Sequence, residues 1–299
     1  MLIIARVGDQ QTWEAASAYR DRLDSLKIVV VTRAGLIAAL NRGLESATGD
    51  ILVFTDDDAE AQADWLERIE RSFFSPRIGA VGGRDWLQLP AEPAIFEPLE
   101  VKHVGVISWY GKQYGNHHCP LRGNTKEVMF LKGVNMAIRR SAVGSYRIDH
   151  RLRGSGSQVG SELDLCLHLR RLGFAVIFDH RILVKHHSSA RPKDDLRNDV
   201  TGPVVNDICY NTHYLVAKHL ELHRSLAYFG YGRVMGSRLF PGWLAAAKWS
   251  LKGDRFVWNR LLQMTKIAAE GLRSGRRARA VAPRSTTDLE PLSQQGSAA

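Results

Sequence analysis

The chain has 299 residues, of which 44% are hydrophobic and 24% charged, and this composition excludes fibrous and wholly disordered proteins. Its three cysteines, Cys119, Cys166 and Cys209, lie far apart without a Cys-x-x-Cys spacing, so we expect reduced thiols in a cytoplasmic protein. No apolar run reaches the roughly 18 to 20 residues of a membrane span, and no signal-peptide pattern opens the chain. The formal net charge of +10 favours anionic partners.

Apolar runs alternate with helix-like stretches in the first third of the chain. The runs occupy residues 2–4, 28–31 and 51–54. Between the last two, Ile37, Leu40 and Leu44 share one face of a helix that ends at Gly49. This alternation predicts an α/β fold in which helices cover a mostly parallel, Rossmann-like sheet.

The middle of the chain departs from this pattern and then returns to it. From Arg84 to about Lys132, Pro, Gly, His and aromatic residues accumulate, as expected of a long functional excursion from the sheet. A helix is then predicted from Ser161 to Gly173, followed by a strand over 174–178. A second helix-then-strand unit therefore completes the α/β domain.

We divide the chain into three parts. Residues 1–195 form the α/β domain, 196–275 an amphipathic helical appendage, and 276–299 a disordered basic tail. The arginines of the segment 271–284 and the amphipathic helices predict peripheral docking on an anionic membrane surface. No nucleic acid partner is expected, because the basic residues are not interleaved with aromatic residues in a recognised module.

Three consecutive carboxylates, Asp56, Asp57 and Asp58, follow the buried run 51–54. In an open α/β sheet, ligands bind beyond the carboxyl ends of the strands. Adjacent carboxylates repel one another unless a cation compensates, and oxygen ligands suit Mg²⁺ or Mn²⁺. The alternative is a solvated acidic turn, which is the more common setting for an isolated Asp triplet.

The surroundings of this triplet favour the metal site, because ordered motifs lie on both sides of it. They comprise Gly35, Leu36, Ala38, Asn41 and Gly43; Ala47 and Gly49 to Leu52; Trp65 and Leu66; Gly82 to Asp85; Gly133 to Ala137 with Arg139 and Arg140; and Gly160 to Leu165. With them the chain resembles the family 2 glycosyltransferases with a GT-A fold. The resemblance implies an inverting, metal-dependent hexosyl transfer from a nucleoside diphosphate sugar to a hydroxyl acceptor. That acceptor would be a glycan or lipid-linked molecule in polysaccharide or cell-envelope synthesis.

Matching positions assign the chemical roles. The resemblance makes Asp58 the first metal ligand and puts Asp56 and Asp57 near metal and ribose, with Glu162 as the base and Asp164 as a second catalytic candidate. Both acids could instead only complement the dipole of the helix that begins there.

A histidine that touches the metal or diphosphate is expected near the end of the last strand. Strand alternation turns only one of His186 and His187 toward the cleft without showing which, and we favour His186. Both could instead be ordinary surface histidines.

The same resemblance supplies candidates for substrate binding, each with a structural alternative. They are Arg33, Gly83, Arg84, Asp85, Gly133 and Asn135. Asn135 could bind sugar hydroxyls, whereas Arg84 and Asp85 could form only an ion pair and Arg33 could simply be solvated. Gly133 could belong only to a turn. For the segment 115–118 we favour a polar acceptor loop over a second metal site.

The N-terminus departs from the family pattern. Residues 2–9 match the family's second strand, so the first strand is expected to be missing. The chain could therefore be a non-catalytic nucleotide-sugar-binding relative. A nucleotidyltransferase is a further alternative, although no Gly-rich phosphate loop supports it.

Overall fold

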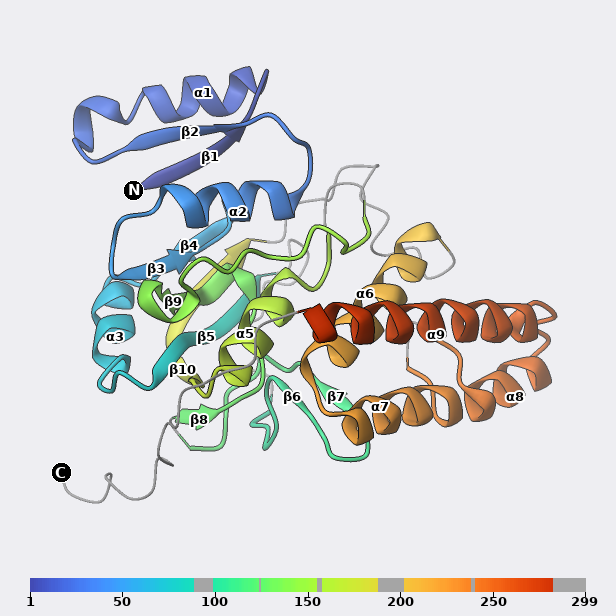
Figure 1. Ribbon diagram of the computed structural model, residues 1–299. Helices are drawn as coiled ribbons and strands as arrows, with labels where there is room; N and C mark the ends of the chain where they lie inside the picture. Colours follow the sequence, from blue (N-terminus) through green and yellow to red (C-terminus); the bar gives the residue numbers. More distant parts are fainter. Residues whose placement is uncertain (89–98, 124, 155–157, 188–201, 238–239, 282–299) are drawn as a thin grey trace.

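The protein is described by a computed structural model covering residues 1–88, 99–123, 125–154, 158–187, 202–237 and 240–281. Figure 1 shows a small N-terminal sheet with its helices, a larger central sheet, and a group of C-terminal helices beside it. The predicted boundary at 195/196 lies outside the described residues.

The N-terminal sheet has two strands. β1 (Leu2–Arg6) pairs in parallel with β2 (Lys27–Val31), and α1 (Gln10–Ser17) and the short helix η1 (Arg20–Arg22) connect them. Among the described residues this pair forms no hydrogen-bonded ladder with the central sheet. The absence of the family's first strand, expected from the sequence, stays a prediction.

The helix α2 (Leu36–Ser46) lies between the two sheets in Figure 1. It buries Ile37 and Leu44 and half-buries Leu40, which confirms the face predicted from sequence.

The central sheet has the strand order β3-β9-β5-β10-β4, with β8 (Thr125–Glu127) also paired to β10. Its main strands are β3 (Ile51–Phe54), β5 (Ile78–Gln88), β9 (Met136–Arg139) and β10 (Ala175–His187), and β4 (Ala59–Ala61) forms one end. β5 and β10 are parallel, whereas β9 is antiparallel to both β3 and β5. β3, β5 and β10 therefore run in one direction and end at the same edge.

Two apolar clusters hold this sheet between helices. Strand alternation sends Ala80 to the cluster shared with α2 and α5 (Ser161–Arg171), and Val81 to the cluster shared with α3 (Trp65–Ser72). α5 begins at the predicted Ser161, and Gly173 follows it with φ +89°. The α/β class predicted from sequence is confirmed.

In the described residues of the excursion between β5 and β9, all helices and strands are short. They are β6 (Val106–Ile107), β7 (Gln113–Tyr114), β8 and the short helix η2 (Gly133–Asn135), and α4 (Arg140–Val143) follows β9. The loss of periodicity in the sequence reflects this irregular backbone.

Four helices end the described chain: α6 (Pro203–His219), α7 (Leu222–Val234), α8 (Trp243–Leu251) and α9 (Val257–Val281). Most of the second half of α6 is buried, including Lys218 and His219, so α6 is a core helix and not an amphipathic surface helix. Within the described residues, none of the helices combines the length and apolarity needed to span a membrane.

The predicted start of a disordered tail at residue 276 is wrong, because α9 continues to Val281. Packing explains the extension: Ala278 is buried, and the guanidinium of Arg279 donates to the carbonyl of Leu220 and to Glu221. Residues 282–299 lie outside the described chain.

Two glycines let α9 approach α6 closely. A Cβ at Gly271 would lie 2.6 Å from the carbonyl oxygen of Tyr210, and one at Gly275 would overlap the carbonyl of Tyr214. The backbones of the two helices are therefore in direct contact.

We predict that a Gly→Ala substitution has opposite effects on the free energy of unfolding in α9 and in α7. Gly275→Ala should lower the free energy of unfolding by about 1–3 kcal/mol, because the methyl group overlaps α6. Gly230→Ala in α7 has open space within 4 Å and should raise it by about 0.5–1 kcal/mol through helix propensity. Urea unfolding of both variants measures the difference, and equal effects would contradict the close helix contact.

Candidate active site

The carboxyl ends of β3 and β10 bring three potential metal ligands together. Atoms of Asp56, Asp58 and His186 that could bind a metal all lie within 4.8 Å of one another, and His186 Nε2 lies 3.1 Å from an Asp58 oxygen. The pairing of β4 with β10 creates this proximity, since His186 is opposite Ala59 and the His187 N–H donates to the carbonyl of Asp58.

Strand alternation separates the two histidines. His186 faces Asp58, whereas His187 Nε2 lies 3.1 Å from a Glu60 oxygen, away from the cluster. The choice between them, open in the sequence, follows from the register of β10 against β4.

A buried carboxylate orients His186. Its Nδ1 lies 3.1 Å from Asp85 Oδ1, and Asp85 is fully buried and paired with Lys132. When Nδ1–H donates to Asp85, the Nε2 lone pair points to Asp56 and Asp58, as in many metal-binding histidines. Asp85 was predicted to bind substrate, but its burial gives it this orienting role instead.

The acidic cluster is electrostatically crowded. The pKa of Asp56 is raised because protein atoms desolvate its carboxylate and because Asp58, Asp57 and Glu162 repel its charge, while His186 opposes the shift. The structure gives Asp56 and Asp58 no lysine or arginine partner among the described residues. A divalent cation would relieve this repulsion, and the donor set fits one.

Glu162 is the other acid at this site. It lies in the first turn of α5, half-buried, where the Ser161 hydroxyl donates to its Oε2 over 2.9 Å. Its charge contributes to the raised pKa of Asp56, so the two carboxylates lie near each other.

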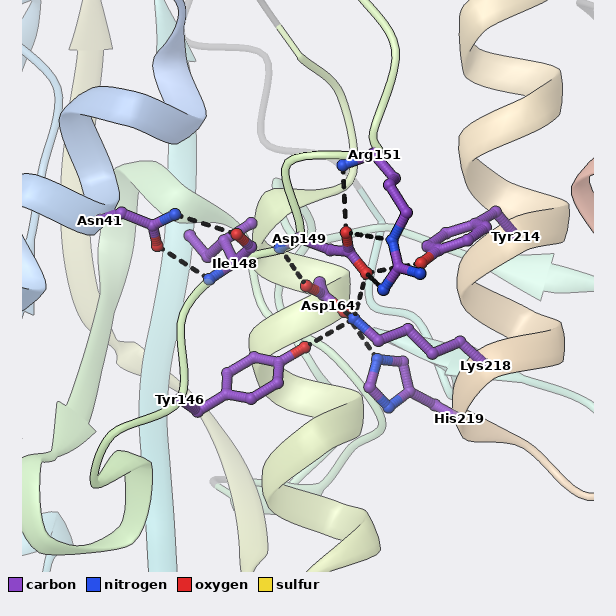
Figure 2. Close-up of polar contacts among 9 residues, drawn as sticks. All are labelled: Asn41, Tyr146, Ile148, Asp149, Arg151, Asp164, Tyr214, Lys218 and His219. Atoms are coloured by element: carbon purple, nitrogen blue, oxygen red, sulfur yellow. Dashed lines mark hydrogen bonds and ion pairs between the residues drawn. The ribbon is translucent and has the colours of Figure 1, made fainter. Parts of the chain in front are cut away.

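Asp164, the second predicted catalytic acid, lies elsewhere. It is fully buried, and its Oδ1 accepts hydrogen bonds from Lys218 (2.9 Å) and His219 (2.6 Å) of α6. Figure 2 shows these side chains converging on it. Asp164 therefore contacts α6 and not the Asp56 cluster, because residues two apart on a helix face different directions.

Two more predicted binding residues have structural roles. The Asn135 amide accepts from Trp65 Nε1 and donates to the carbonyls of Arg84 and Ile182, so its buried side chain has no hydrogen left for a sugar. A Cβ at Gly83 would overlap the Ile182 carbonyl, so Gly83 permits the close pairing of β5 and β10.

The remaining candidates differ in exposure. Gly133 has open space beside it, Asp57 and Arg33 are exposed, and Arg84 is buried with its Nε donating to the carbonyl of His118. Burial lowers the pKa of His117 to about 4, so this histidine is a neutral core residue. That is consistent with a loop at 115–118 and gives no support to a second metal site.

Sequence reasoning missed Lys132 and the polar residues of α6. The available signal was that Lys218 and His219 directly follow the apolar run 214–217 in the predicted helical region.

Comparisons with known proteins agree with this geometry. The model of Glycosyl transferase family 2 matches residues 7–144. A glucosyl-dolichyl phosphate glucuronosyltransferase of Haloferax volcanii is 27% identical over 160 residues, which cover 51% of this chain and 47% of that protein. Glycosyltransferase AglE of the same organism is 31% identical over 84 residues, 28% of each chain. The chain thus spans about half or less of the curated relatives it matches.

Solved structures show the same fold. The crystal structure of GalNAc-T7 with UDP, GalNAc and Mn²⁺ aligns with a TM-score of 0.56 at 12% identity, covering 93% of this chain and 50% of that one. The match over residues 7–144 identifies this part of the chain as a family 2 glycosyltransferase sequence, and the curated homologues and the GT-A arrangement of the sheet support that assignment.

Proposed function

We propose that the protein is an inverting glycosyltransferase that moves a hexosyl group from a nucleoside diphosphate sugar to a hydroxyl acceptor. The observation that carries this proposal is the meeting of Asp56, Asp58 and His186, with Glu162 near enough for its charge to contribute to the raised pKa of Asp56. A diphosphate leaving group needs a cation beside it, and an acceptor hydroxyl needs a base. The cluster offers the cation site and Glu162 the base.

In this proposal each residue has a defined task. Glu162 accepts the proton of the acceptor hydroxyl as its oxygen attacks the anomeric carbon, and the nucleoside diphosphate leaves from the opposite face. Asp57 and Arg33, both exposed, contact the nucleotide. Open space at Gly133 lets the backbone of η2 approach the sugar.

Asp56, Asp58 and His186 would hold Mn²⁺ in preference to Mg²⁺, since an imidazole is a poor ligand for the harder ion. When bound, the ion stabilises the negative charge of the departing diphosphate. The GalNAc-T7 structure contains Mn²⁺ together with UDP, which supports the same assignment here.

We expect Asp85→Asn to weaken Mn²⁺ binding about 10- to 100-fold, because His186 loses the carboxylate that orients it. Asp58→Ala should abolish measurable binding. Glu60→Gln is the matched control, since Glu60 contacts only the neighbouring His187 in the described chain. Mn²⁺ titrations followed by electron paramagnetic resonance measure all three, and equal affinities of the Asp85 and Glu60 variants would contradict the assignment.

Transfer or hydrolysis from a panel of nucleotide sugars with Mn²⁺ tests the enzyme itself. We expect Glu162→Gln to lower kcat by about 10²- to 10⁴-fold through loss of the base, and Asp58→Ala to abolish activity. Glu127→Gln, on the distant surface pair with Arg170, is the control.

The product distinguishes the alternatives. Release of pyrophosphate would indicate a nucleotidyltransferase, whereas a glycosyltransferase releases the nucleoside diphosphate. Nucleotide-sugar binding without turnover in the wild type would leave only the non-catalytic alternative.

We further propose a glycan or lipid-linked acceptor that the protein meets at the cytoplasmic face of a membrane, in cell-envelope glycan synthesis. One relative is named for a dolichyl phosphate substrate. Apolar side chains of α8 and of its connection to α9 are exposed: Leu251 (90%), Phe256 (72%), Leu244 (58%) and Trp243 (56%).

Basic side chains accompany this apolar surface. Lys248, Lys252 and Arg255 lie in the same segment, and the only acid there, Asp254, is paired with Arg260. Apolar groups flanked by cations suit the boundary between headgroups and acyl chains of an anionic bilayer.

Flotation with phosphatidylglycerol vesicles tests this surface. The double variant Leu251→Ser with Phe256→Ser should bind at least about tenfold more weakly, because two large apolar groups no longer enter the bilayer. Leu66→Ser with Phe74→Ser removes apolar groups of comparable exposure (61% and 78%) near α3 and should bind like the wild type. Equal flotation of the two double variants would exclude this docking surface.

A further inference from the structure

We propose that α6 is a positioning element of the active site. Through Asn211, Tyr214, Lys218 and His219 it holds residues 146–154, the segment that precedes α5, the helix that carries Glu162. This inference rests on the proposed role of Glu162 as the base. It makes the C-terminal helices part of the catalytic unit, although the family model ends at residue 144.

Asn211 and Asn41 hold the segment from opposite sides. Asn41 of α2 donates to the carbonyl of Ile148 and accepts its N–H, at 2.9 and 2.8 Å. Asn211 of α6 makes the same two bonds to Arg153, at 2.8 and 2.7 Å, and also donates to the carbonyl of Val159. Both ends of this backbone segment are therefore fixed by buried amides just before Gly160 and α5.

Between these two amides lies a closed ionic cluster (Figure 2). The ammonium of Lys218 donates to Tyr146, Asp149 and Asp164, each at 2.9 Å, so all three of its hydrogens are used. Arg151 binds Asp149 through two nitrogens. Two cations thus balance two carboxylates.

His219 completes the cluster as a neutral donor. Its Nε2 lies 2.6 Å from Asp164 Oδ1, while its buried Nδ1 has no hydrogen-bond partner. This pattern fits an imidazole protonated on Nε2 only.

The other oxygen of Asp164 connects the cluster to the backbone. Asp164 Oδ2 accepts the N–H of Asp149 over 2.9 Å. Asp164 and Glu162 belong to the same turn of α5, so α6 fixes the rotation of that turn through Asp164. The direction in which Glu162 points follows from this contact, because the helix is rigid over so short a distance.

Lys218 is a poor choice for a test, since its loss would leave the buried carboxylate of Asp164 without a cation and endanger folding. His219→Leu removes one neutral donor and keeps the charge balance. His219→Gln restores an N–H donor. His213→Leu is the matched control, because His213 is an equally buried histidine of α6 whose ring contacts Tyr228 and Phe229 of α7.

Kinetics with a nucleotide sugar and Mn²⁺ provide the first measurement. We expect His219→Leu to lower kcat about 10- to 100-fold with the donor KM within about twofold of wild type, as for a displaced reacting group. His219→Gln should recover most of kcat, and His213→Leu should match the wild type. Equal losses in the two leucine variants, or no loss in His219→Leu, would overturn the proposal.

Hydrogen exchange provides a second measurement that needs no activity. The amides of residues 146–154 should exchange faster in His219→Leu than in His213→Leu at equal global stability, because the Asp164 bond to the Asp149 N–H is weakened. Unchanged exchange of these amides in His219→Leu would refute the positioning role of α6, even if the enzyme is active. Inactivity of the wild type with the expected exchange would instead reject only the proposed function.

Discussion

The ammonium of Lys218 lies between two buried carboxylates, and the arrangement of the whole site depends on that contact. Asp164 of the α/β domain is fully buried and could not stay an anion there without a compensating charge, whereas Asp149 also pairs with Arg151 of the same domain. The compensating lysine comes from α6. Loss of one partner from such a buried group typically costs about 3–5 kcal/mol, which is a large share of a domain's stability. The α/β domain therefore needs α6 in order to keep these acids where they are.

The charge of a second acidic cluster in the same domain is not compensated in this way. Asp56 and Asp58 face a histidine held by Asp85 and have no lysine or arginine partner among the described residues. The raised pKa of Asp56 reflects the desolvation and repulsion that result. One cluster is thus neutralised by cations of the protein, whereas the other keeps an excess of negative charge that a bound cation would balance.

Local patterns in the sequence predicted helices and strands and the position of the acidic triplet after a strand, because these features depend on neighbours along the chain. The helix from Ser161 and the buried face of Ile37 and Leu44 were found in this way. The pattern could not assign Glu162 and Asp164, since both are acids at one helix start and only the distant Lys218 tells them apart. The sequence similarly suggested that Asn135 could bind a ligand, but in the structure its side-chain oxygen accepts a hydrogen bond from Trp65.

Composition also gave a wrong prediction for the residues directly after 275, where packing decides the structure. The arginine-rich stretch after residue 275 has the composition of a disordered tail, yet it continues α9 because Gly275 and Ala278 pack closely. Gly275 lies against the backbone of Tyr214, whose hydroxyl donates to Asp149 in the ionic cluster. Contacts therefore run without a break from α9 through α6 to the segment before α5. A division of the chain near residue 195 separates two stretches of sequence, but the packing of α6 and α9 joins them into one folded unit.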